Sequence, residues 1–99
     1  MQENAAVAQR AAEVLVGNYR PAPITLVRGR GCRVEDAEGR RYLDLMGGIA
    51  TVALGHCHPR VLAALHEQAE KLWHVSNLFT SEPQVALAER LVRHSFAER

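Results

Sequence analysis

One stretch constrains this chain more than any other: a strand that runs into a glycine-rich, nearly uncharged loop and then into a helix. It covers residues 41–59 and reads RYLDLMGGIATVALGHCHP. The strand alternation stops at Gly47-Gly48, where paired glycines permit backbone angles and close approaches that a side chain would block. Residues 49–54 carry no charge and one polar side chain, Thr51. Since so apolar a loop does not suit a solvated linker, we expect it to be buried.

The segments around this loop predict a helix, a small antiparallel meander and two further helices. Dense alanines, with Asn4 as N-cap, predict a helix over residues 4–16. Strands are expected at residues 24–28, 32–35 and 40–45. Pro59 begins a helix that runs to about residue 74, and Ser81 with Gln84 forms a capping box for a last helix that continues to the end of the chain. The predicted fold class is α/β.

Length and composition bound the function. The 99 residues suit one small domain, and a hydrophobic content of 47% is sufficient for a core. A net charge of +1 gives no support to nucleic acid or an anionic membrane as a partner. Two cysteines, Cys32 and Cys57, are too few for a secreted disulfide scaffold. With no export signal and no apolar run of about 20 residues, we expect a cytoplasmic protein.

The triplet His56-Cys57-His58 suggests a metal site or a nucleophile, but the pattern favours a structural loop. Adjacent residues of an extended loop point in different directions, and no second cluster lies at zinc-like spacing. Cys57 as a nucleophile would need an oriented base, which the sequence does not indicate. We therefore predict no metal site.

Two other patterns also have plain structural interpretations. Gly29-Arg30-Gly31 lacks the third glycine and the following helix of a phosphate-binding loop, so it predicts a bend between strands. Glu35, Asp36 and Glu38 crowd a turn, which is typical of a solvated charge cluster.

Two long motifs, taken in order, are more specific than any single piece. They are NYRPAPITLVRGRGCRVEDAEGRRYLDLMGGIATVALGHCHP at residues 18–59 and HVSNLFTSEPQVALAERL at residues 74–91. Together they resemble the N-terminal part of the class III pyridoxal-phosphate aminotransferases, the acetylornithine and ornithine aminotransferase group. Within that group, the GGIA and SNLF runs look like the acetylornithine enzymes, whereas ornithine enzymes typically carry a tyrosine where this chain has Ile49.

The resemblance implies a PLP-dependent transferase of fold type I, of which this chain is an N-terminal fragment. Residues 1–48 would join the small domain, and residues 49–99 would begin the large PLP-binding domain. Such enzymes hold pyridoxal 5'-phosphate through a lysine, with a carboxylate on the ring nitrogen. The family's residues for both roles lie beyond this chain, and Lys71, its single lysine, falls on the polar side of a helix. We therefore expect no catalytic and no cofactor-binding residue here.

The resemblance also implies a substrate site and a partner. Tyr19 matches a family tyrosine near the substrate carboxylate, and Ile49 with Ser76 and Asn77 would line the same mouth. An ordinary aromatic at Tyr19 and local turn bonding at Ser76-Asn77 are the alternatives. The glycine loop would be buried at the interface of a homodimer.

The implied reaction is amino transfer between N-acetylornithine and 2-oxoglutarate in arginine biosynthesis. Another class III aminotransferase, acting on ornithine, succinylornithine or a related substrate, is the first alternative. A non-catalytic α/β interaction module is the second.

Overall fold

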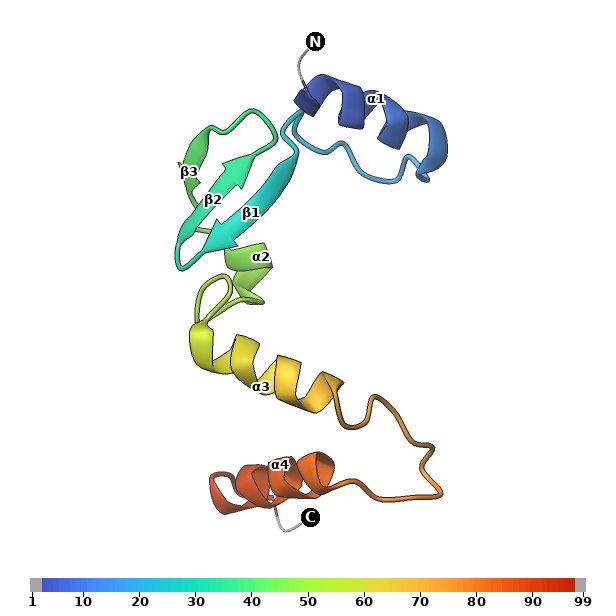
Figure 1. Cartoon of the computed structure of the whole chain (residues 1–99), viewed down its shortest axis with the longest axis vertical. Helices are drawn as coiled ribbons and strands as arrows, with labels where there is room; N and C mark the ends of the chain where they lie inside the picture. Colours follow the sequence, from blue (N-terminus) through green and yellow to red (C-terminus); the bar gives the residue numbers. More distant parts are fainter. Residues whose placement is uncertain (1–2, 98–99) are drawn as a thin grey trace. The chain divides into compact units, whose positions relative to one another are not determined.

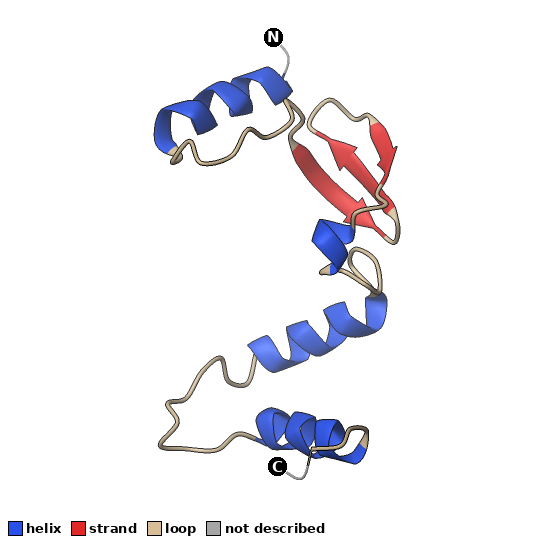
Figure 2. Cartoon of the chain, turned by 180° about the vertical axis from the view of Figure 1, so that it is seen from behind, coloured by secondary structure: helices blue, strands red, loops and turns tan. Residues whose placement is uncertain are grey.

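The computed structural model describes residues 3–97, which divide into two units at the boundary between Leu65 and His66. Helices and strands follow one another as α1 (Glu3–Val14), β1 (Leu26–Arg30), β2 (Arg33–Asp36), β3 (Arg41–Leu43), α2 (Gly47–Ala50), α3 (Pro59–Ala69) and α4 (Glu82–Arg93), as Figures 1 and 2 show. The first unit holds the sheet and the second holds α4, while α3 crosses the boundary.

The three strands form the predicted antiparallel meander in the order β1-β2-β3. Their bounds differ from the predicted ones, because Gly29 and Arg30 belong to β1 rather than to a bend. The strand begins at Leu26 rather than at residue 24, and its register is irregular between Leu26 and Arg28. The third strand ends at Leu43, although the next amide, that of Asp44, still donates to the carbonyl of Cys32 at 2.8 Å.

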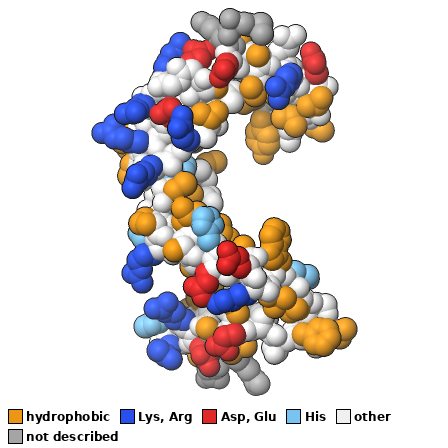
Figure 3. Space-filling view, in the orientation of Figure 1, with side chains coloured by type: hydrophobic (Ala, Val, Ile, Leu, Met, Phe, Trp, Pro, Cys, Tyr) orange, Lys and Arg blue, Asp and Glu red, His pale blue; other side chains and the backbone are white. Residues whose placement is uncertain are grey.

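The register gives the sheet one charged face. Arg28 and Arg41 each lie opposite Glu35, and their guanidinium groups lie 3.0 and 3.5 Å from its carboxylate. At the end of the hairpin, Arg30 lies opposite Arg33. Figure 3 shows basic side chains gathered over this part of the molecule. Since both arginine side chains of these pairs are largely exposed, we attribute little stability to the pairs.

The core within residues 3–97 is far smaller than the composition predicts. Val34 is the single buried hydrophobic side chain there, so the expectation of a compact domain core is wrong. The glycine loop is not buried by this chain either, since Ile49 is 83% and Leu54 is 67% exposed. Hydrophobic side chains also lie on the surface of the helices (Figure 3). The apolar faces predicted from sequence exist, but they are left exposed within residues 3–97.

The predicted cap of the first helix is wrong, whereas Ser81 is the N-cap residue of the last helix but lacks the predicted capping bond. Asn4 lies inside α1, where its side chain bonds to other parts of the first unit instead of capping. Ser81 has the extended backbone of an N-cap residue, but its side chain makes no capping hydrogen bond. The last helix does not run to the end of the chain, because it stops at Arg93, where the amide of His94 closes the final turn on the carbonyl of Arg90.

The third helix is also shorter than predicted, ending at Ala69 rather than near residue 74. At its end, the indole of Trp73 donates to the backbone carbonyl of Ala69 at 2.6 Å. The side-chain amide of Gln68 donates to the backbone carbonyl of Leu72 at 2.8 Å. These side chains satisfy carbonyls that a continuing helix would have used. Among residues 3–97, no helix has both the length and the apolar character needed to cross a membrane.

Candidate functional site

The glycine loop contains a left-handed turn, which the sequence did not predict. The four successive residues of α2, from Gly47 to Ala50, have positive φ angles of 54°, 63°, 59° and 61°. Hydrogen bonds of 2.9 Å join the amide of Ala50 to the carbonyl of Met46 and the amide of Val52 to that of Gly47. Glycine adopts such angles freely, but each other residue costs roughly 1–2 kcal/mol. A β-branched residue such as Ile49 is a genuine outlier there, and strain of this kind concentrates at functional sites.

Asp44 uses one carboxylate oxygen to hold the start of this turn and the other to contact His56. Its Oδ1 accepts hydrogen bonds from the backbone amides of Met46 and Gly47, both at 2.9 Å. Its Oδ2 lies 2.6 Å from Nε2 of His56. A carboxylate oxygen only accepts, so Nε2 of His56 carries the hydrogen in this contact. The side chain of Asp44, just after β3, therefore connects the beginning of the turn to His56, twelve positions later in the sequence.

His56 is itself fixed to the meander by its backbone. It exchanges two hydrogen bonds of 2.9 Å with Gly31, which form an isolated antiparallel bridge. Its ring lies against Gly29, where an added Cβ would come within 2.7 Å of the ring Cγ. An added Cβ at Gly55 would likewise come within 2.9 Å of the Cα of Gly31. The close approach of the loop to β1 therefore requires glycine on both sides.

The charge state of Asp44 strengthens this arrangement. The hydrogen bond from His56 holds the pKa of Asp44 below its ordinary value, and the amides of Gly47 and Met46 lower it further, against the opposing effect of burial. Asp44 is therefore ionised at neutral pH. Hydrogen bonds to an ionised acceptor are roughly twice as strong as those between neutral groups.

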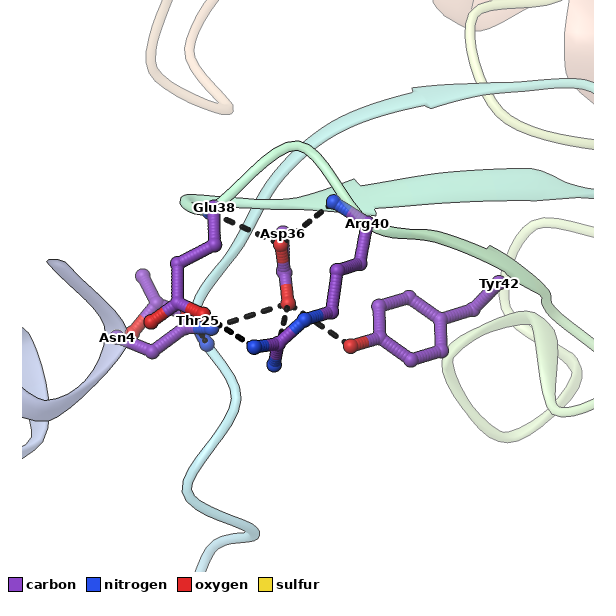
Figure 4. A network of polar contacts seen from close by, with 6 residues as sticks. All are labelled: Asn4, Thr25, Asp36, Glu38, Arg40 and Tyr42. Atoms are coloured by element: carbon purple, nitrogen blue, oxygen red, sulfur yellow. Dashed lines mark hydrogen bonds and ion pairs between the residues drawn. The ribbon is translucent and has the colours of Figure 1, made fainter. Parts of the chain in front are cut away.

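A second polar network fastens α1 to the sheet around Asp36 (Figure 4). This side chain is 1% exposed, so the predicted solvated charge cluster is wrong at this position. Its carboxylate accepts from Asn4 Nδ2 at 3.0 Å, from the Tyr42 hydroxyl at 2.8 Å, and from the amides of Glu38 and Arg40 at 2.9 Å each. Asn4 also accepts from the amide of Thr25 at 2.9 Å.

These donors determine the protonation of Asp36. Burial alone would raise its pKa, but the hydrogen bonds from the Arg40 amide, Tyr42, Asn4 and the Glu38 amide outweigh burial and lower the pKa to about 2. The same contact raises the pKa of Tyr42, because ionising its hydroxyl would remove the hydrogen bond to Asp36. The network is an ionised structural centre that positions the first helix.

Two of the predicted substrate residues, Tyr19 and Ile49, lie in the first unit with free side chains. Tyr19 follows α1 in an irregular segment and is 82% exposed. Ile49 is 83% exposed on the left-handed turn. Within residues 3–97 no hydrogen bond involves the Tyr19 hydroxyl, and nothing brings these two side chains together. Their roles toward a substrate remain predictions.

The other two predicted residues, Ser76 and Asn77, lie in the second unit. The Ser76 hydroxyl accepts from the amide of Leu78 at 3.1 Å, and its carbonyl accepts from Phe79 at 3.0 Å. Ser76 thus makes the local turn bonds that the alternative interpretation predicts. Asn77 lines an open groove against one side of α4, together with Phe79, Thr80, Gln84, Val85, Ala88, Glu89 and Val92.

Within residues 3–97, Lys71 does not have the surroundings of a cofactor-binding lysine. Lys71 is exposed, and its Nζ lies 2.6 Å from Oε1 of Glu67, one turn earlier. A lysine that binds the cofactor needs a defined pocket around its amine, and Lys71 lines neither the pocket beside the sheet nor the groove beside α4. No group of three His, Cys, Asp or Glu side chains in the described part of the chain is placed to hold a metal ion. The thiol of Cys57 is exposed and takes part in none of the described polar contacts.

Sequence reasoning missed the central pair of this site. It treated His56 as a possible metal ligand and Asp44 as an ordinary strand residue, although both belong to the motifs that carry the family resemblance. The available signal was the combination of a polar residue at the end of a strand with paired glycines directly after it. Such a side chain often bonds to the following amides, as Asp44 does here.

Comparison with known proteins identifies the family of this chain. The family model for class III aminotransferases matches residues 15–99. The acetylornithine aminotransferase of Myxococcus xanthus is 54% identical over 94 residues, covering 95% of this chain and 23% of that protein. Acetylornithine aminotransferase 1 of Pseudomonas syringae pv. tomato is 57% identical over 99 residues, covering 98% of this chain and 24% of that protein. This chain thus spans about a quarter of the length of these relatives.

Solved structures agree with the sequence matches. The N-acetylornithine aminotransferase of Stenotrophomonas maltophilia has a TM-score of 0.81 at 47% identity, over 92% of this chain and 24% of that one. The ornithine aminotransferase of Toxoplasma gondii has a TM-score of 0.92 at 28% identity, over 100% of this chain and 23% of that one. The fold class predicted from the sequence is confirmed. The chain belongs to the class III aminotransferase family.

Proposed function

We propose that this chain is the N-terminal part of an acetylornithine aminotransferase, which transfers an amino group between N-acetylornithine and 2-oxoglutarate in arginine biosynthesis. The observation that carries the proposal is the identity of 54% and 57%, along nearly the whole chain, to two proteins that bear this name. The full-length enzyme would use pyridoxal 5'-phosphate, whose chemistry is to withdraw electrons from the amino-acid carbon. Its lysine and ring-nitrogen carboxylate would come from residues outside this chain.

The proposed arrangement assigns parts of this chain to different regions of that enzyme. Residues 1–48 would join the small domain, and residues 49–99 would begin the large domain. The exposed glycine loop and helix faces would be covered by the rest of the enzyme and by a second subunit of a homodimer. The proposed enzyme is cytoplasmic, acts on small amino-acid substrates and has no membrane or nucleic-acid partner. Tyr19, Ile49, Ser76 and Asn77 would lie near the substrate.

Ile49 is the residue proposed to distinguish the acylated substrate from free ornithine. The acyl group removes the charge of one amine and adds a methyl group, which an aliphatic side chain contacts better than a hydroxyl does. A tyrosine would offer a hydrogen bond to the free ammonium of ornithine, worth about 1.5–3 kcal/mol. The exposed, outward side chain of Ile49 is available for such a contact.

Steady-state kinetics of the full-length protein with N-acetylornithine and ornithine tests the proposal. Ile49→Tyr should shift the ratio of kcat/KM toward ornithine by about tenfold to a hundredfold, the range of a methyl-sized contact. Ile49→Val, which keeps a β-branched aliphatic side chain, should leave the ratio within about threefold. The substitution to tyrosine adds no backbone strain, since a β-branched residue already occupies the left-handed position.

The same assay separates the alternatives. A wild-type preference for ornithine or succinylornithine would assign the protein to another class III specificity. No transamination of any of the three by the full-length protein would leave the non-catalytic interaction module. An unchanged ratio in Ile49→Tyr would show that Ile49 does not face the substrate.

A further inference from the structure

The left-handed turn at residues 47–50 lacks support from its own side chains. Gly47 and Gly48 have none, and Ile49, the most strained of the four, is 83% exposed. A strained conformation persists only where its surroundings determine it. Contacts other than the packing of Ile49 must therefore hold the turn within this chain.

The contacts of Asp44 and His56 supply that support. A single carboxylate oxygen of Asp44 accepts hydrogen bonds, each of 2.9 Å, from the backbone amides of Met46 and Gly47, which lead into the turn. Its other oxygen is held at 2.6 Å by His56. Without His56, nothing among the described contacts fixes the direction of the carboxylate, so its bonds to the two amides would open more readily.

His56 can fix that direction because it is anchored independently of the turn. Its amide and carbonyl both bond to Gly31, and its ring rests on Gly29. The ring thus extends from the sheet to Asp44, and no part of it depends on residues 47–50. A continuous series of contacts therefore connects β1 to His56, His56 to Asp44, and Asp44 to the backbone of the turn.

We propose that Asp44 and His56 form a latch that holds residues 47–50 left-handed, so that His56 is a positioning residue for substrate selection through Ile49. The substrate part of this inference rests on the proposed aminotransferase function. The latch on the backbone does not, because it follows from the contacts alone. His56 acts without touching the substrate, since its ring is occupied by Asp44 and the sheet.

The test uses the full-length protein with three histidine variants. His56→Leu removes the donor to Asp44. His56→Gln keeps an N–H donor at similar reach and serves as the rescue. His66→Leu is the matched control, because His66 is exposed on α3 and makes no side-chain hydrogen bond among the described residues.

The first readout is hydrogen exchange at the amides of Met46 and Gly47. We expect exchange at least tenfold faster in His56→Leu than in the wild type. His56→Gln should lie within about threefold of the wild type, and His66→Leu should be unchanged. Equal protection in His56→Leu and the wild type would overturn the latch, whatever the enzyme's activity.

The second readout is substrate selection, measured as the separate half-reactions with N-acetylornithine and with glutamate. Glutamate carries no acylated side chain for Ile49 to contact. His56→Leu should therefore lower kcat/KM for N-acetylornithine by about tenfold and leave that for glutamate within about twofold. Equal loss for both substrates would assign His56 a general structural role and refute substrate positioning.

A double-mutant cycle shows whether the effect passes through Ile49. If it does, His56→Leu should change the ratio of the two half-reactions much less in an Ile49→Ala background than in the wild type. Additive effects would refute the coupling. A full-length protein that transaminates neither substrate would defeat the proposed function and with it the role in selection, while hydrogen exchange still decides the latch.

Discussion

Replacing Gly29 with alanine tests how tightly the glycine loop is held against the sheet. An added Cβ would lie 2.7 Å from Cγ, 2.8 Å from Cβ and 3.0 Å from Nδ1 of His56. These three atoms are near the backbone, which is fixed by two hydrogen bonds to Gly31, so the side chain cannot swing aside as the end of a long one would. Gly29 has no positive φ, so the alanine meets a clash without backbone strain.

The magnitude follows from the two ways of relieving this clash. To move from 2.7 Å to an ordinary contact of 3.4 Å, the ring must shift by about 0.7 Å. A shift that breaks the 2.6 Å contact with Asp44 removes a hydrogen bond to a charged group, worth about 1.5–3 kcal/mol. Retaining the contact instead overpacks the site, which costs about 1–3 kcal/mol. Because one cost replaces the other, we expect a loss of about 1.5–3 kcal/mol rather than their sum.

Hydrogen exchange at the amides of Gly31 and His56 measures this loss, because those two amides form the bridge and report local opening. Gly29→Ala should speed their exchange by roughly tenfold to a hundredfold in the full-length protein. Gly17→Ala is the matched control, since an added Cβ there meets nothing within 4 Å and its φ is not positive. It should change protection by less than about 0.5 kcal/mol. If Gly29→Ala behaves like this control, the loop does not rest on β1 as described.

Three further predictions concern the rest of the chain. Asp36 has a folded pKa of about 2 against an ordinary 3.8, so its stabilising effect is complete above about pH 4 and is lost as pH falls toward 2; Asp36→Asn should weaken folding at neutral pH and flatten the acid limb of the unfolding profile. Pyridoxal phosphate should give no stoichiometric adduct at Lys71, which pairs with Glu67 on an exposed helix surface; borohydride reduction with peptide mapping checks this, and full labelling at micromolar cofactor would contradict it. The isolated 99-residue chain should self-associate through its exposed apolar faces, which sedimentation velocity measures; a sharp, concentration-independent thermal transition of a monomer would contradict it.

The sequence predicted the order and type of the elements well, because their signals are local. Alternation and turn residues are enough to indicate a three-stranded meander, and Pro59 starts a helix where it stands. Their ends were predicted less well, since an end also depends on side-chain hydrogen bonds to the last backbone carbonyls. Trp73 and Gln68 close off α3 through contacts that periodicity does not contain.

The contents of the site were harder to predict, because each decisive contact joins residues far apart in the sequence. Asn4 looked like a cap, yet its amide crosses 32 positions to Asp36. Asp36 looked like a surface carboxylate in the sequence. Hydrogen bonds from Asn4, from Tyr42 and from two nearby backbone amides allow it to be buried instead. The family resemblance supplied the candidate substrate residues, but it did not indicate the pairing of Asp44 with His56.

The glycines of this chain explain why the missed pairing was difficult to see. Gly29 was interpreted as part of a bend, the usual reason for glycine between two strands. Its actual neighbour is a histidine 27 positions later, and Gly55 faces Gly31 in the same way. Gly29 and Gly55 allow two segments to approach each other closely, whereas Gly47 and Gly48 allow the backbone to be left-handed. The two uses are linked, because the approach at Gly29 places the ring of His56 where Asp44 can hold the strained turn. Sequence alone reports only that the glycines are present, and the partner of each must be known before its purpose can be assigned.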